Sequence, residues 1–197
     1  MTTGASFVPS SASGSPSAWA KRLPVLALAL VGCGIATYLA AYQWGLLASV
    51  WDPLFGRGSA RILDSWLSRR LPVPDAALGA LAYLAEAISG AIGDARRWRS
   101  RPWIVIVFGL LVAGLALASV FLVLAQAFLF QTGCTLCLLS AAISFTNAWL
   151  ARDEIAATLS HLGRVRARRG ALWQALRGRA PEPAGGAQSS NHRREPV

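Results

Sequence analysis

The sequence is poor in the residues that hold metal ions and crosslink small domains. Its 197 residues include three cysteines and two histidines, and both histidines, His161 and His192, lie in the C-terminal part. Three cysteines exclude a structural disulfide framework. Cys134 and Cys137 alone are too few ligands for a zinc site. We therefore expect no metal site.

Charged residues are also scarce, and they are absent from the longest apolar run. Apolar residues make up 54% of the chain and the mean hydropathy is +0.45, which fits a small polytopic membrane protein better than a soluble domain. The formal net charge is +10. Its basic residues gather between apolar runs and in the tail, where they orient membrane proteins. Basic and aromatic residues do not interleave as single-strand binders require, so we expect no nucleic-acid partner.

Four apolar runs divide the chain, at residues 23–50, 75–93, 102–130 and 134–150. A membrane span needs roughly 20 apolar residues. The third run contains no charged residue and fits this requirement best, whereas the fourth only just reaches it. The pattern predicts an all-α membrane protein, a four-helix transmembrane bundle over residues 23–151.

The segments outside this bundle are polar or basic. Residues 1–22 and 180–197 are expected to be disordered, because they hold little large apolar surface. Residues 152–179 are interpreted as a basic helix on the anionic cytoplasmic surface of the membrane. Between the first two runs, residues 59–70 are predicted to form a short amphipathic helix on the opposite surface.

The basic flanks predict the orientation in the membrane. Lys21-Arg22, the loop at 96–101 and the arginine-rich tail belong to the cytoplasmic side. This places a multi-pass protein in the cell membrane, plasma or inner, with both termini in the cytoplasm. The segment at 51–74 then lies outside with the turn before Cys134, although its arginines mean that it meets the rule only in part. In a bacterium the outer compartment is oxidising.

Cys134 and Cys137 form a Cys-x-x-Cys pair at the start of the fourth run. Two thiols at this spacing can close into a disulfide and reopen, and a helix N-terminus capped by Thr132 or Gly133 would favour the reactive thiolate. We expect Cys134 to meet soluble partners at the surface, and Cys137, one turn deeper, to meet a lipid-soluble oxidant. The alternative is that both are small packing residues, since free cysteine is commonly buried.

Two polar residues interrupt the apolar runs. Glu86 in the second run is either a functional acid or a residue near the inner end that snorkels or pairs with an arginine of the 96–101 loop, and we favour the second interpretation. Gln126 in the third run is expected to form an interhelical hydrogen bond.

Three motifs follow one another in this chain. They are Gly58-Ser59 with Leu63 and Ser65, then Pro72-Val73-Pro74 with Gly79 and Tyr83, then Cys134-x-x-Cys137. In this order and spacing they resemble the vitamin K epoxide reductase family, in its bacterial four-span form, over residues 23–150. The resemblance implies a four-helix membrane bundle around a quinone, and a quinone-dependent thiol-disulfide oxidoreductase.

The resemblance also implies a role for each matching residue. Cys137 would attack or complex the quinone, and Cys134 would exchange with a thiol donor. The quinone-binding positions of the family fall on Asp75, Gly79, Tyr83 and Ser65. Asp75 has a second interpretation, because a carboxylate at a helix start is stabilised by the helix dipole. The implied partners are membrane lipid, a quinone substrate and an extracytoplasmic thiol protein.

Two features of the usual family members are missing. Their loop cysteines, which shuttle electrons to the Cys-x-x-Cys pair, would align with Ser59 and about Pro53. Cys33 is expected in mid-membrane as a packing residue and cannot replace them. The thioredoxin-like domain of some bacterial relatives is also missing. Either an external thiol therefore reaches Cys134 directly, or the chain is a non-catalytic module that binds a quinone or a partner membrane protein.

Overall fold

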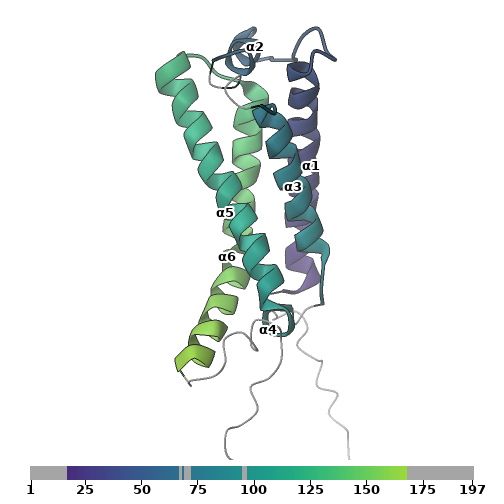
Figure 1. Cartoon of the computed structure of the whole chain (residues 1–197), viewed down its shortest axis with the longest axis vertical. Coiled ribbons are helices and arrows are strands. Elements are labelled where there is room, and N and C mark those ends of the chain that lie inside the picture. Colours follow the sequence, from purple (N-terminus) through teal and green to yellow (C-terminus); the bar gives the residue numbers. More distant parts are fainter. Residues whose placement is uncertain (1–16, 67, 69–71, 95–96, 168–197) are drawn as a thin grey trace, which may run out of the picture.

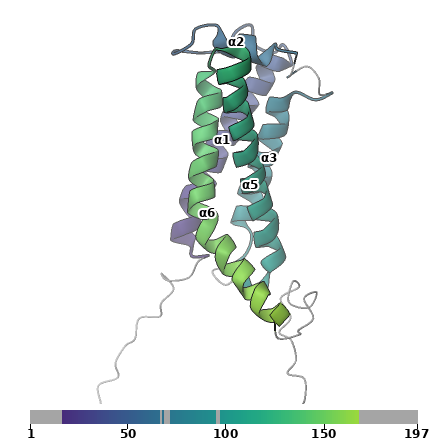
Figure 2. The ribbon, with the colours of Figure 1, turned by 90° about the vertical axis from the view of Figure 1, so that its left-hand side faces the viewer.

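The long helices of the chain lie side by side as one bundle. The computed structural model describes residues 17–66, 68, 72–94 and 97–167, and within these ranges all regular structure is helical. The bundle consists of α1 (Trp19–Gln43), α3 (Asp75–Ala91), α5 (Pro102–Ala125) and α6 (Thr135–Ala167). Figures 1 and 2 show them aligned along one axis. The predicted all-α architecture is therefore confirmed.

Two short helices lie at opposite ends of the bundle (Figure 1). α2 (Gly58–Leu63) lies across the end where α6 begins, and α4 (Arg97–Ser100) lies at the end where α5 begins. The α2 helix is shorter than the predicted surface helix at 59–70: after Leu63 the described chain forms turns. Residues 67, 69 and 70 of that prediction lie outside the described residues.

α5 begins at a proline and continues into a π-helical segment. Pro102 occupies the first turn, where its fixed φ favours a helix and its missing N–H costs nothing. The helix continues directly into η3, a π-helical segment at Gln126–Phe130. That segment ends at Gln131, which has a left-handed φ of 48°. α1, and α5 together with η3, are long and apolar enough to cross a membrane.

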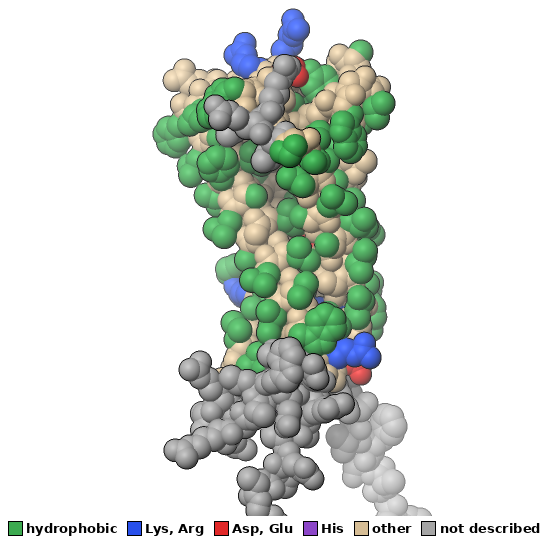
Figure 3. Space-filling view, in the orientation of Figure 1, with side chains coloured by type: hydrophobic (Ala, Val, Ile, Leu, Met, Phe, Trp, Pro, Cys, Tyr) green, Lys and Arg blue, Asp and Glu red, His purple; other side chains and the backbone are tan. Residues whose placement is uncertain are grey.

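Small residues let α1 and α3 approach closely, as is common between helices in membranes. Gly32 of α1 faces the ring of Tyr83, so close that a Cβ atom at Gly32 would lie 2.7 Å from the ring. Ala29, Ala36 and Ala87 complete this part of the core. On the outside, apolar side chains cover the visible long face of the bundle and Lys and Arg lie toward its ends (Figure 3).

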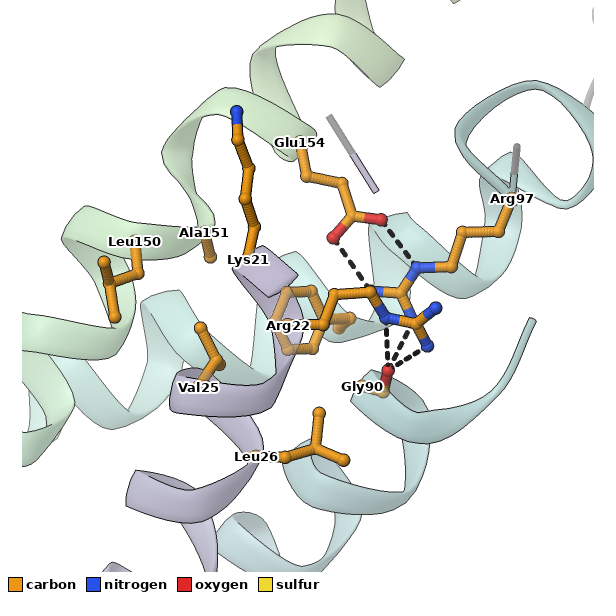
Figure 4. Close-up of a pocket in the computed structure, with 10 residues that line it drawn as sticks. Lys21, Arg22, Val25, Leu26, Gly90, Arg97, Leu150, Ala151 and Glu154 are labelled. Carbon is orange, nitrogen blue, oxygen red and sulfur yellow. Dashed lines mark hydrogen bonds and ion pairs between the residues drawn. The ribbon is translucent and has the colours of Figure 1, made fainter. Parts of the chain in front are cut away.

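A buried charge network closes the end of the bundle at α4. The Arg97 guanidinium pairs with Glu154 of α6 through two hydrogen bonds, Nε to Oε1 at 2.6 Å and Nη2 to Oε2 at 2.8 Å. Its Nη1 donates to the carbonyls of Ser89, Gly90 and Ile92. Figure 4 shows Arg22 of α1 directed at the same Gly90 carbonyl. The two arginines thus satisfy the carbonyls that the C-terminal end of α3 leaves without helical partners.

The helix ends differ from the predicted segments. α1 begins at Trp19, so residues 19–22 of the expected N-terminal tail are helical, and it ends at Gln43 rather than near residue 50. α6 continues without interruption through residue 152 to Ala167. Residues 1–16 and 168–197 lie outside the described part, so the expected tails and the separate basic helix at 152–179 stay predictions.

Glu86 has a different partner from the one we favoured. Its side chain is 1% exposed, and its Oε1 accepts a hydrogen bond from Asn147 Nδ2 of α6 at 2.8 Å. Arg97 of the 96–101 loop enters the bundle, but it pairs with Glu154 and not with Glu86. Glu86 lies one helical turn before Gly90, whose carbonyl accepts a hydrogen bond from Arg97.

Candidate active site

The Cys134–Cys137 pair forms a disulfide at the start of α6, with 5.2 Å between the Cα atoms. Cys134 directly precedes the helix, and its carbonyl accepts the N–H of Leu138. Its sulfur accepts the N–H of Cys137 at 3.1 Å. The capping position that we predicted for Thr132 or Gly133 thus belongs to Cys134 itself. A backbone N–H of the first turn of α6, that of Cys137, thus points at this sulfur, and such a donor favours the thiolate.

The turn before the disulfide wraps around one side chain, Gln126. The Oε1 atom of Gln126 accepts the N–H of Cys134 at 2.9 Å. The main-chain carbonyl of the same residue accepts the N–H groups of Gln131 and Thr132. We expected the side chain of Gln126 to form a hydrogen bond with another helix. It bonds instead to the main chain of Cys134, the residue directly before α6. It anchors the turn that carries the cysteine pair, and it does so from a π-helical segment of the kind often found at functional sites.

Cys134 is fully buried, with 0% exposure, which contradicts its predicted place at the surface. The segment between α1 and α2 covers it. Phe55 of that segment lies over Gly133, where a Cβ atom would meet the phenyl ring at 2.4 Å, and Gly58 lies against the Gly133 carbonyl. Beneath this cover, Cys134 packs with Leu39 and with Leu63 of α2. We call residues 51–58 the cover loop.

Asp52 holds the cover loop in place. Its Oδ2 accepts the N–H and the hydroxyl of Ser59, at 2.9 and 2.7 Å. Its Oδ1 accepts the N–H of Phe55 at 3.1 Å and the hydroxyl of Thr135, in the first turn of α6, at 2.5 Å. Burial by itself raises the pKa of Asp52, but the hydrogen bonds from Thr135, Ser59 and Phe55 outweigh it and lower the pKa from 3.8 to about 2.

Cys137 borders a cavity of about 630 Å³ that lies between the helices near the α2 end. Near this end α5 leans away from α3 (Figure 1). The walls are mainly aliphatic, with side chains such as Leu39, Leu111 and Leu122. A space of this size, with mainly aliphatic walls and some polar groups, is typical of a binding site for a small apolar molecule.

The four predicted quinone-site residues all border this cavity together with Cys137. They are Ser65, Asp75, Gly79 and Tyr83. Four polar residues that the sequence analysis did not assign to the site lie beside them: Ser68, Ser119, Gln126 and Ser140. Polarity within or next to an apolar run was the only sequence signal that marked them.

Asp75 shows both features that the sequence suggested. It opens α3 after Pro74, and its Oδ1 accepts hydrogen bonds from Ser68 Oγ at 2.7 Å and from Gln43 Nε2 at 2.5 Å. It also borders the cavity. The carboxylate thus ties the ends of α1 and α3 to Ser68 and forms part of a polar rim of the cavity.

The Tyr83 hydroxyl is bonded to α6. It donates to the Ser140 carbonyl at 2.8 Å and lies 2.6 Å from Ser144 Oγ. Gly79, one turn earlier on α3, faces Ala36 of α1 without crowding it. Tyr83 is therefore one of the residues that line the cavity. Its hydroxyl fixes α3 against the part of α6 that begins one turn after Cys137.

Ser59 and Cys33 lie apart from the disulfide chemistry. Ser59, which the resemblance would align with the second loop cysteine of the family, is buried and bonded to Asp52. Cys33 is unpaired in α1, packs against the core and contacts the Ala80 carbonyl at 3.5 Å. Among the described residues, no group of three or more His, Cys, Asp or Glu is arranged to hold a metal ion.

The fold and the site together define a helical membrane protein with a cysteine pair beside an apolar cavity. The sequence model of the vitamin K epoxide reductase family matches residues 23–152, about two thirds of the chain, and the protein belongs to this family. Its members are membrane oxidoreductases that act on thiols, disulfides and quinones. A comparison with curated protein sequences found no match.

Proposed function

We propose that the protein is an integral-membrane thiol:quinone oxidoreductase in which Cys134 and Cys137 are the redox centre. The observation that carries the proposal is the position of Cys137, in the disulfide and on the wall of the 630 Å³ cavity. A quinone in this cavity would lie next to the sulfur with which it exchanges electrons. Asp75, Gly79, Tyr83 and Ser65 are the proposed lining of the binding site.

The proposed reaction balances without a further oxidant. In the direction that forms the disulfide, the two S–H bonds of Cys134 and Cys137 are broken and one S–S bond forms. Two electrons and two protons pass to the quinone, which becomes a hydroquinone. An external dithiol then reduces the Cys134–Cys137 disulfide by exchange and is itself oxidised to a disulfide.

We propose four membrane spans, α1, α3, α5 and α6, with both termini in the cytoplasm. α1 and α5 meet the length and apolarity of a span. The antiparallel bundle supports the assignment for α3 and α6, since each packs along α1 and α5. The cover loop, α2 and the cysteine pair then share the outer side of the cell membrane, where a thiol partner in an oxidising compartment would meet them.

The partner thiol would attack Cys134, because Cys137 lies one turn deeper in α6. Since Cys134 is fully buried, the cover loop has to move before the exchange. The other cysteine of the printed sequence, Cys33, lies within α1 away from the disulfide, and the resemblance would align Ser59 with the second loop cysteine. We therefore propose that an external thiol, and not an internal relay, supplies the electrons.

Thiol trapping in membranes tests the proposal. Membranes holding the reduced protein are incubated with and without quinone, and free thiols are then alkylated and counted. We expect quinone to protect Cys134 and Cys137 from alkylation and to leave Cys33 unchanged. A cysteine pair whose redox state never responds to any quinone would refute the proposal.

Capture of the thiol partner is a separate test. In a Cys137→Ala variant, Cys134 has no neighbour to resolve a mixed disulfide, so the partner should stay attached to it. The Cys134→Ala variant is the control and should retain no partner. The attached protein can be identified by mass spectrometry.

The second candidate function is a non-catalytic module that binds a quinone or a partner membrane protein. The burial of Cys134 under the cover loop favours it, together with the serine at position 59. Replacement of Cys137 by alanine distinguishes the two functions. An unchanged cellular phenotype in this variant would support the binding module, and loss of the phenotype would support the oxidoreductase.

A further inference from the structure

Gln126 carries a hydrogen-bond donor for which the described part of the chain offers no acceptor. Its side chain is 4% exposed and borders the cavity. Its Nε2 atom has no hydrogen-bond partner among the residues that the structure describes. A buried donor without an acceptor costs free energy, so such groups in folded proteins call for an explanation.

The direction of this amide is determined by its other contact. The main-chain N–H of Cys134 can only donate, so the Gln126 atom that faces it at 2.9 Å must be the oxygen. The NH₂ group is then necessarily the atom without a partner. Exchanging the two amide atoms would leave the Cys134 N–H against a second donor.

The surroundings of Gln126 indicate which acceptor is missing. The side chain lies on the wall of a mainly aliphatic cavity that is also bordered by Cys137. Gln126 belongs to the uncharged run at 102–130. The other side chains of this run that can form hydrogen bonds are those of Trp103 and Ser119. An apolar ligand that carries a carbonyl oxygen would fill the cavity and offer an acceptor to this NH₂ group.

We propose that Gln126 binds a quinone carbonyl oxygen through its NH₂ group while its Oε1 holds the main chain of Cys134. This inference rests on the proposed quinone reaction and assigns to it a residue that couples ligand position to the cysteine pair. Reduction of the quinone increases the negative charge on its oxygens. A fixed N–H donor therefore favours the electron transfer as well as binding.

Two substitutions separate the two roles of the amide. Gln126→Glu retains an oxygen for the Cys134 N–H and replaces the NH₂ group by a second acceptor. Gln126→Leu removes both contacts at similar volume. Thr146→Val is the control, because Thr146 is exposed on α6 and its hydroxyl bonds to the Ala142 carbonyl of its own helix.

The assay follows disulfide formation in the reduced protein with tetramethyl-1,4-benzoquinone as the probe. We expect Gln126→Glu at pH 7 to raise the half-saturating quinone concentration about tenfold, as the loss of one buried hydrogen bond implies. Disulfide formation by diamide, an oxidant that needs no quinone site, should change less in Gln126→Glu than in Gln126→Leu, because the glutamate keeps the oxygen that accepts the Cys134 N–H. Gln126→Leu should slow both reactions, because the turn that carries Cys134 loses its anchor.

A pH series of quinone saturation distinguishes a ligand-binding role of Gln126 from a purely structural one. Protonation of the introduced glutamate restores an O–H donor, so quinone saturation in Gln126→Glu should recover toward the wild-type value in acid. Wild type and Thr146→Val should not show this recovery.

The outcomes separate this inference from the proposed function. If wild type responds to the quinone and Gln126→Glu saturates within twofold of it at pH 7, the role of Gln126 is refuted and the oxidoreductase stands. If wild type responds to diamide but not to any quinone, the proposed function itself is refuted, and the role of Gln126 with it.

Discussion

The carboxylate of Asp52 accepts a hydrogen bond from the hydroxyl of Thr135, at 2.5 Å between Oδ1 and Oγ1. This contact joins the cover loop to the first turn of α6, next to the buried sulfur of Cys134. The same carboxylate binds Phe55 and Ser59 within the loop. Asp52 therefore ties the cover loop to the start of α6, and we expect access to the cysteine pair to depend on it.

Replacement of Asp52 by asparagine should loosen the cover loop. The amide presents an NH₂ group to donors that now converge on a carboxylate, and each charge-assisted hydrogen bond contributes about 1.5–3 kcal/mol. We expect a membrane-impermeant phosphine to reduce the Cys134–Cys137 disulfide about tenfold faster, which alkylation of the released thiols would measure. Asp64→Asn is the control, because Asp64 is exposed and lies outside the cover loop, at the end of α2. Equal reduction rates in the two variants would contradict the role of Asp52.

Acid should open the cover loop only at very low pH. Because the pKa of Asp52 is depressed to about 2, the stability that its carboxylate contributes is fully present above the unfolded value and is lost as the pH falls through about 2. We expect phosphine access to the disulfide to stay constant from pH 7 to about pH 4, near the pKa of a free aspartate, and to rise below it. A rise between pH 6 and pH 5 that persists in Asp52→Asn would assign the opening to another group.

Gly32→Ala should destabilise the bundle. A Cβ atom at this position would lie 2.7 Å from the Tyr83 ring, which is held by its bonds to Ser140 and Ser144. Overpacking of this kind costs about 1–3 kcal/mol. Gly34→Ala is the matched control, since nothing lies within 4 Å of its added Cβ atom. Thermal unfolding in detergent should show a lower midpoint for Gly32→Ala alone.

Glu86→Gln should be tolerated, and Glu86→Ala should not. Asn147 Nδ2 donates to Glu86 Oε1, while Glu86 Oε2 and Asn147 Oδ1 have no partner within the described ranges of the chain. Glutamine keeps the acceptor and adds an NH₂ group that Asn147 Oδ1 can accept from.

Alanine leaves the buried Asn147 amide with only the long hydrogen bond of its Nδ2 to the Val25 carbonyl, at 3.4 Å, and the loss of the shorter bond costs about 1–3 kcal/mol. The measurement is the unfolding midpoint of both variants in the same detergent. An equal loss of stability in Glu86→Gln and Glu86→Ala would contradict this account of the pair.

The sequence predicted which helices and residues form the site, but it placed Cys134 at the surface, where the structure buries it. Apolar runs marked the four long helices because a helix in a bundle buries apolar side chains against its neighbours. The Cys-x-x-Cys spacing predicted a disulfide within the first turn of α6, and the structure has it. The resemblance named Ser65, Asp75, Gly79 and Tyr83, and these residues do share a cavity with Cys137.

The partners in long-range contacts could not be predicted from the sequence. Glu154 lay in a segment interpreted as a surface helix, yet it pairs with Arg97, 57 positions earlier in the chain. Gln126 was expected to join two helices, yet its side chain anchors the turn of Cys134. A polar residue in an apolar run has to find a partner, but the run itself does not specify which one.

By itself, the sequence determined that this is an all-helical chain with one cysteine pair at a helix start, because apolar periodicity and Cys-x-x-Cys spacing are local properties. Only the tertiary structure decided that Cys134 is covered and that Cys137 faces a cavity. Those features arise where Asp52 meets Thr135 and where Gln126 meets Cys134. Such contacts form only when the helices pack, since they join residues that no local pattern relates.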